Sequence, residues 1–127
     1  MKYDEINSQS IDKLMDIFYN KIRADKSELG EIFNNKVGRS DDAWVVHKAK
    51  IARFWRSMLL GEPCYDGQPM KAHIDLPPFP KELFNTWLEI FYESLDLVFN
   101  EKPRNFIFQR AEGIAKRFKY MIYEVKH

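Results

Sequence analysis

A histidine followed by three prolines is the feature of this chain that most clearly suggests chemistry. His73 lies within the segment 71–80. The prolines after it are Pro77, Pro78 and Pro80. Because proline lacks a backbone N–H and clashes with the preceding turn, a helix that carries His73 cannot continue through them. The sequence therefore predicts a short element with a stiff exit that directs one imidazole at a target.

Three further side chains that form hydrogen bonds lie on apolar helical stripes. His47 follows Trp44 by three residues, so it points with the buried stripe of its helix. Tyr19 and Trp87 lie on comparable stripes of two other helices. Each also has a simpler interpretation as a core residue, whether a satisfied histidine or an aromatic ring at the edge of the core. Together with His73, however, they form a set of donors that an ordinary helical core does not require.

These residues fit some kinds of site poorly. The potential zinc ligands His47, Cys64 and His73 match no recurring zinc spacing. Cys64 lies in a loop with no helix directly after it to lower its pKa, which disfavours a Cys–His nucleophile. The chain has neither a G-x-S-x-G turn nor a glycine-rich phosphate loop. A haem site fits better, because it needs one axial histidine and polar groups inside an apolar pocket on the other side.

The composition and net charge indicate what kind of protein would carry such a site. The chain has 127 residues, 45% of them hydrophobic and 31% charged, which is typical of a soluble globular protein, and we expect a single domain over residues 1–127. Its net charge of +1 gives no reason to expect a nucleic-acid partner. Residues 1–10 are neither a signal peptide nor a membrane span, and a lone cysteine is compatible with the cytoplasm. The aromatic fraction of 15% suits a bulky core or a pocket for a flat apolar ligand.

Helical periodicity dominates the sequence and predicts an all-α fold of four main helices and at least one short helix, over residues 28–33. Ser10 and Ser40 are expected to cap two of the main helices, and Gly61 to end the second of these. Pro80 and Pro103 are expected as the first residues of the last two. The expected inward-facing residues are Ile11, Leu14, Met15, Phe18, Tyr19 and Ile22; Trp44, His47, Ile51, Phe54, Trp55 and Met58; Phe84, Trp87, Leu88, Phe91, Leu95, Val98 and Phe99; and Ile107, Ala111, Ile114, Phe118, Met121 and Ile122.

Several of these residues belong to longer runs whose order along the chain is distinctive. The runs are the helix Ile11–Ala24 with Phe18-Tyr19, Trp44-x-x-His47-Lys48-Ala49-Lys50-Ile51, Phe54-Trp55, His73-x-Asp75-Leu76-Pro77-Pro78-Phe79, and Trp87. This ordered set resembles group III of the truncated haemoglobins over essentially the whole chain. The Pro-Pro-Phe-Pro exit after His73 is its most specific element. The glycine pairs that mark the other truncated-haemoglobin groups are missing here.

The resemblance implies a shortened globin fold, in which two helix pairs form a two-on-two sandwich around haem b. It implies that His73 is the proximal ligand of the haem iron. Tyr19 and Trp87 match distal donors of hydrogen bonds to bound oxygen, and His47 matches a distal histidine that donates to the ligand or gates its access. The other positions that the resemblance assigns to the haem pocket are Phe33, Ile51 and Phe54. Lys50, three residues after His47 and nearer the helix edge, is expected either to reach a haem propionate or to be a solvated lysine.

The function that follows is reversible oxygen binding by a cytoplasmic haemoprotein, with nitric oxide and carbon monoxide as further ligands. Strong donors beside the ligand predict slow oxygen release and high affinity. An alternative is a haem enzyme that handles peroxide or nitric oxide and takes electrons from a separate reductase, since no flavin or nicotinamide domain is fused. The sequence does not separate these two. A third interpretation is a haem-free helical interaction module, which a Soret band in the purified protein would exclude.

Overall fold

The chain is almost entirely helical in the residues that the computed structural model describes, which are 2–62 and 82–120. The helices in this part of the chain are α1 (Ser8–Ala24), α2 (Glu28–Val37), α3 (Asp41–Leu60), α5 (Glu82–Val98) and α6 (Glu101–Lys119). A single bridge between Tyr3 and Phe99 is the β-type pairing in these ranges. The predicted all-α fold is confirmed. His73, Cys64 and the prolines after His73 lie outside the described residues.

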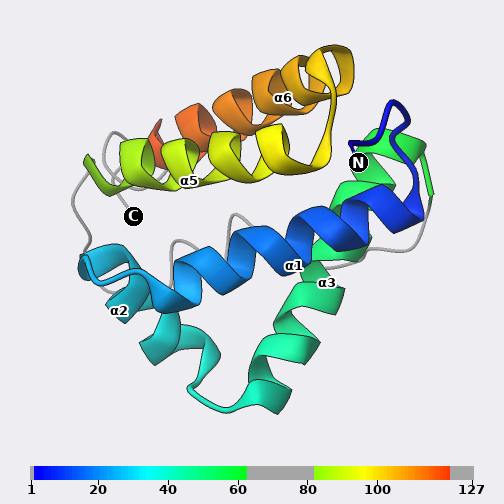
Figure 1. Cartoon of the computed structure of the whole chain (residues 1–127). Coiled ribbons are helices and arrows are strands. Elements are labelled where there is room, and N and C mark those ends of the chain that lie inside the picture. Colours follow the sequence, from blue (N-terminus) through cyan, green and yellow to red (C-terminus); the bar gives the residue numbers. More distant parts are fainter. Residues whose placement is uncertain (1, 63–81, 121–127) are drawn as a thin grey trace.

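The helices form two pairs, α1 with α3 and α5 with α6 (Figure 1). α1 lies between α3 on one side and α5 on the other, and it also packs against α2. Because α1 is covered on several sides, its whole apolar stripe is buried, with Ile11, Leu14 and Ile22 at 0% exposure. α3 is covered less, and its stripe is fully buried at Trp44 and Trp55 and partly buried elsewhere. The buried core consists of Ile11, Leu14, Met15, Phe18, Tyr19, Ile22, Leu29, Phe33, Trp44, Ala52, Trp55, Phe84, Phe91, Leu95, Val98, Phe99, Ile107, Ala111 and Ala115.

The N-terminus of α1 differs from the prediction. Asn7, not Ser10, is the cap residue, and Ser10 occupies the third helical position. The Asn7 side chain accepts from the Ser10 backbone N–H, and the Ser10 hydroxyl oxygen accepts from the Asn7 backbone N–H, both at 2.9 Å. This reciprocal capping box satisfies two backbone donors, so the helix starts one turn earlier than a cap at Ser10 would allow.

The second helix is also longer than predicted, since α2 continues past Phe33 to Val37. Asn34 does not interrupt it, because its side-chain amide donates to the carbonyl oxygens of Gly30 at 2.9 Å and Arg23 at 3.2 Å. Gly38 ends the helix with φ at 115°, a conformation that favours glycine. Ser40 then caps α3 by accepting from the Ala43 backbone N–H at 3.1 Å, as predicted.

The last helix begins two residues before its proline. α6 starts at Glu101, so Pro103 is its third residue and not its first. The first turn of a helix has no internal partner for its N–H groups, so proline fits there at any of these positions. Gly61 ends α3 in the left-handed conformation as predicted, with φ at 70°. α5 is described from Glu82 onward, and Pro80 lies outside the described residues.

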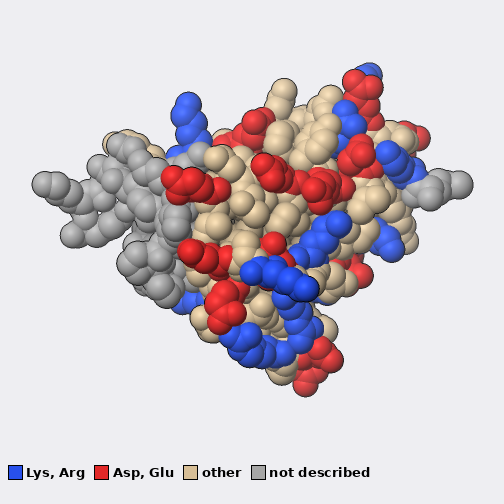
Figure 2. All heavy atoms as spheres, turned by 60° about the vertical axis from the view of Figure 1, so that its left-hand side comes forward, with Lys and Arg blue, Asp and Glu red and all other residues tan. Residues whose placement is uncertain are grey.

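Ion pairs join α1 to α3 along the exposed side of their contact. Lys48 Nζ lies 2.9 Å from Asp16 Oδ1, and Arg56 Nη1 lies 3.2 Å from Asp12 Oδ1. Figure 2 shows basic and acidic side chains interspersed over one face of the molecule. Exposed pairs of this kind contribute little each, so the packing of the core carries most of the stability. Within residues 2–62 and 82–120, no helix combines the length and the apolar character that a bilayer crossing requires.

Candidate functional site

Tyr19 and His47 meet between α1 and α3. Their ring centroids are 4.7 Å apart and the rings are nearly perpendicular, at 87°. Tyr19 is 5% exposed, and the Nε2 atom of His47 is buried. α1 presents Tyr19 on its apolar stripe, and α3 presents His47 one turn after its buried residue Trp44. Two side chains that can donate hydrogen bonds, each predicted to face inward, are thus in contact inside the protein.

Trp44 lies against both members of this pair. Its ring centroid is 6.2 Å from that of Tyr19 and 5.8 Å from that of His47. Its indole Nε1–H donates to the carbonyl oxygen of Gly38 at 2.9 Å, and its ring is 1% exposed. The guanidinium of Arg23 lies 5.8 Å from the ring centroid. Sequence reasoning placed Trp44 on the buried stripe but gave it no part in the site.

Two aromatic residues extend the pair toward the other helices. Phe33, from α2, contacts Tyr19 with ring centroids 6.3 Å apart. Phe18 contacts Tyr19 at 4.8 Å and Trp87 of α5 at 5.6 Å, edge to face in both cases. Trp87 in turn stacks on Phe91 at 5.4 Å with an interplanar angle of 7°. Phe18, which the sequence identified only as a core residue, therefore connects the predicted donors of α1 and α5.

The other predicted pocket residues lie on α3. Ile51 and Phe54 are partly buried and pack against the core, and Phe54 contacts Trp55 edge to face at 5.5 Å. Lys50 is exposed. Of the predicted site residues, Phe33, Tyr19, His47 and Trp87 thus belong to one aromatic cluster of directly or indirectly contacting rings. His73, the predicted iron ligand, lies outside the described residues.

Burial controls the protonation of the central hydroxyl. It raises the pKa of Tyr19 well above the ordinary value of 10.0, because a phenolate loses its hydration in this environment. A phenol of ordinary pKa is already protonated at physiological pH, and burial extends this neutral form of Tyr19 to more alkaline pH. The hydroxyl is a neutral hydrogen-bond donor in an apolar setting, where such a bond is stronger than in water.

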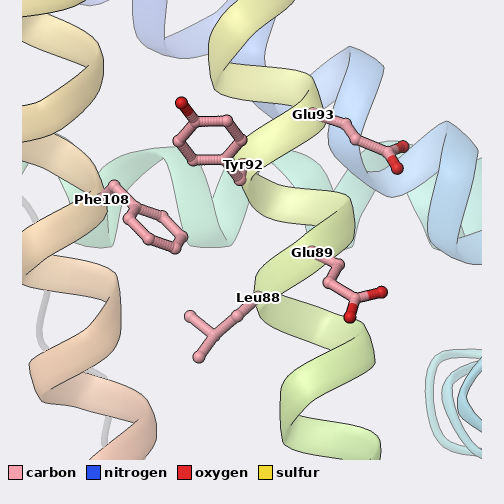
Figure 3. Close-up of a pocket in the computed structure, with 5 residues that line it drawn as sticks. All are labelled: Leu88, Glu89, Tyr92, Glu93 and Phe108. Atoms are coloured by element: carbon pink, nitrogen blue, oxygen red, sulfur yellow. The ribbon is translucent and has the colours of Figure 1, made fainter.

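A surface groove of about 420 Å³ lies elsewhere, along the α5–α6 pair. All five of Leu88, Glu89, Tyr92, Glu93 and Phe108 line it, and Figure 3 shows the carboxylates of Glu89 and Glu93 directed away from the other three side chains. The carboxylates therefore do not converge with the rings on a common ligand. We assign no function to this groove.

A small all-α fold in which two helix pairs enclose hydrogen-bonding side chains on aromatic surfaces is the architecture of a shortened globin. The chain is 57% identical over 124 residues to the group 3 truncated haemoglobin of Campylobacter jejuni, with 98% of this chain and 97% of that protein covered. The crystal structure of the group III truncated haemoglobin from Campylobacter jejuni matches all of both chains with a TM-score of 0.94 and 56% identity. No protein-family model matches the chain. At this identity and coverage, the chain belongs to the group III truncated haemoglobins.

Membership of this family confirms the predicted resemblance and the shortened globin fold, and it implies a globin-type haem cofactor. The described residues fit such a group. Tyr19 offers a neutral hydroxyl, His47 an imidazole and Trp87 an indole, and the surfaces around them are aromatic and apolar. A haem pocket needs this combination of a few polar donors and an otherwise apolar lining.

Proposed function

We propose that this protein, as a single domain over residues 1–127, binds haem b and reversibly binds molecular oxygen with high affinity, together with nitric oxide and carbon monoxide. The observation that carries the proposal is the contact between the buried neutral hydroxyl of Tyr19 and the ring of His47. Polar groups of this kind in an otherwise apolar, aromatic setting are what a pocket for a small polar ligand requires. A cytoplasmic location is part of the proposal, since one cysteine cannot form an internal disulfide.

Each side chain has a part in this proposal. His73 would hold the haem through its imidazole, and the haem, when bound, would supply an iron atom that coordinates diatomic gases. Tyr19 donates its hydroxyl proton in a hydrogen bond toward the ligand, and Trp87 does so with its indole N–H. His47 adds a donor or controls entry to the pocket. The residues that line the pocket are Phe33, Ile51 and Phe54, with Lys50 at its edge for a propionate.

The haem itself is tested by absorption spectra of the purified protein, ferric and ferrous, with and without oxygen and carbon monoxide. We expect a Soret band and a spectrum of histidine ligation. In His73→Gly we expect the loss of the five-coordinate histidine spectrum, because the axial nitrogen is removed. A colourless protein that ignores added haemin would refute the proposal, and a histidine spectrum that survives in His73→Gly would refute the role of His73.

The donor role is tested by oxygen dissociation measured in stopped flow. Trp87→Phe keeps an aromatic ring against Phe18 but removes the N–H. A hydrogen bond of ordinary net strength is worth about 1 kcal/mol, so we expect release to accelerate by about fivefold. Leu88→Met, a volume-conserving change on the neighbouring position of α5, serves as the control and should leave the rate unchanged. An unaltered rate in Trp87→Phe would remove Trp87 from the set of donors.

Catalysis of peroxide or nitric oxide chemistry in the same pocket is the second candidate. It is favoured by the presence of donors on both α1 and α5, because two donors polarise an O–O bond more strongly than one does. Such turnover needs electrons, which the second candidate takes from a separate reductase. Steady consumption of hydrogen peroxide with an added electron donor would favour this candidate, and stable ligand binding without consumption would favour the first.

A further inference from the structure

We propose that Trp44 is a positioning residue for the Tyr19–His47 pair, and that the corner between α2 and α3 sets the orientation of these two donors through it. The inference rests on the proposed function, since it concerns the orientation of donors toward a bound ligand. It adds a residue to which neither the resemblance nor the family comparison assigned a role.

The contacts of Trp44 are arranged on two sides. One side faces the donors, with ring-centroid distances of 6.2 Å to Tyr19 and 5.8 Å to His47. The 49° and 76° interplanar angles make these tilted and edge contacts, in which a rotation of the indole displaces both partners. Because Tyr19 and His47 also touch each other at 4.7 Å, the three rings form a closed triangle. The orientation of one ring therefore limits that of the other two.

The other side of Trp44 is tied to the corner between α2 and α3. The indole Nε1–H donates to the carbonyl oxygen of Gly38 at 2.9 Å, which fixes the rotation of the ring. Gly38 has φ at 115°, and a Cβ there would lie 3.3 Å from the Cβ of Ala43, so a residue with a side chain would disturb this corner. The acceptor of the Trp44 bond is thus held by a backbone conformation that suits glycine.

Arg23 of α1 contacts both Trp44 and the corner between α2 and α3. Its guanidinium lies 5.8 Å from the Trp44 ring centroid, donates to the carbonyl oxygen of Arg39 at 2.8 Å and pairs with Asp41 at 2.8 Å. Arg23 comes one turn after Tyr19 on the same helix. The same residue therefore joins the helix that carries one donor to the corner that holds Trp44. A cation over an indole face is attractive, so Arg23 favours one position of the ring.

The test compares Trp44→Phe with the wild type in three measurements. The infrared C–O stretching band of the carbon monoxide complex reports donors beside the ligand, and we expect it to shift or broaden. We expect oxygen to dissociate between about twofold and about tenfold faster, the range that follows from weakening one hydrogen bond. The nuclear Overhauser effect between the Tyr19 and His47 rings should weaken. It is measured in the reduced protein under carbon monoxide. If the purified protein carries no haem, it is measured in that protein directly.

Two further variants separate positioning from stability. Phe99→Leu removes a ring that is equally buried but contacts Tyr3 at the far end of the core, so it should lower stability without moving the C–O band. Arg23→Gln, on a partly exposed side chain, should produce a smaller change in the same direction as Trp44→Phe. The proposal is overturned if Trp44→Phe alters the band, the rate and the ring contact no more than Phe99→Leu does. A protein without haem would refute the proposed function, while the ring contact would still test the role of Trp44.

Discussion

The hydroxyl of Tyr19 can serve a ligand only while it keeps its proton and its direction. A phenol of ordinary pKa meets the first condition at neutral pH, and burial extends it to alkaline pH because it raises the pKa of Tyr19. Its neighbours provide the second, since Phe18, Phe33, Trp44 and His47 surround the ring on several sides. A hydroxyl held in this way donates without first reorganising, which makes a hydrogen bond to a weakly charged ligand effective.

The raised pKa of Tyr19 predicts a loss of stability in alkali. Above pH 10.0 the unfolded chain releases the Tyr19 proton while the folded protein retains it, so stability is complete below that pH and falls as the pH rises toward the folded pKa. The slope for one proton is about 1.4 kcal/mol per pH unit. Urea unfolding at a series of alkaline pH values should show a steeper decline in the wild type than in Tyr19→Phe. Parallel declines in the two proteins would contradict this account of Tyr19.

At the scale of the helices, the start of α2 lies unusually close to the C-terminal end of α1, at its cap residue Asp25. A Cβ at Gly30 would lie 2.1 Å from the carbonyl oxygen of Asp25, far inside the limit of real contacts. The Gly30 backbone N–H also donates to the Asp25 side chain at 3.2 Å. Phe33 lies one turn further along α2, where it contacts Tyr19. The absence of a side chain at Gly30 therefore lets α2 approach α1 and bring Phe33 to the site.

Gly30→Ala should force the two helices apart. We expect it to destabilise the protein by about 2 kcal/mol, because the added methyl group meets a backbone atom that cannot move aside. The matched control is Gly113→Ala in the middle of α6, where a Cβ meets nothing within 4 Å. That change should stabilise the protein by about 0.5 to 1 kcal/mol through helix propensity. Urea unfolding measures both, and equal effects of the two substitutions would contradict the close approach.

For the whole molecule, the N-terminal segment ties into the turn that joins α5 to α6. Tyr3 donates its backbone N–H to the Val98 carbonyl oxygen at 2.7 Å and accepts from the Asn100 N–H at 2.9 Å. Asp96 on α5 pairs with Arg104 of α6 at 2.9 Å and with Lys2 at 3.7 Å. Residues distant in the sequence thus meet at one end of the core, which connects the start of the α1–α3 pair to the α5–α6 pair.

The charge at this junction predicts an acid-sensitive contribution. The hydrogen bond from Arg104 and the charge of Lys2 lower the pKa of Asp96 below its ordinary 3.8. The stabilisation is therefore complete above pH 3.8 and is lost as the pH falls through the lowered pKa. Asp96→Asn should flatten the dependence of the unfolding midpoint on acid pH, and the difference should shrink in high salt because the pair is exposed. Glu89→Gln, the same charge change elsewhere on α5, should not flatten it.

The helices and most of the core follow from the order of residues alone. The apolar stripe of α1 is buried at every predicted position, and Ser40 and Gly61 begin and end α3 as expected. These features depend on neighbours three or four residues apart, so local spacing carries them. The error at the end of α2 falls where a longer contact intervenes. Asn34 stays helical because it donates to the carbonyl of Arg23 on another helix.

The sequence also predicts which hydrogen-bonding side chains face inward, because Tyr19, His47 and Trp87 each interrupt an otherwise apolar stripe. The spacing of residues within one helix does not predict the angle at which two helices cross. The perpendicular contact of Tyr19 with His47, and the third ring of Trp44 beneath both, exist only because α3 crosses α1 at that point. Which residues are polar and buried is a property of each helix. Which of them touch, and which ring holds them in place, is decided by the packing of helices against one another.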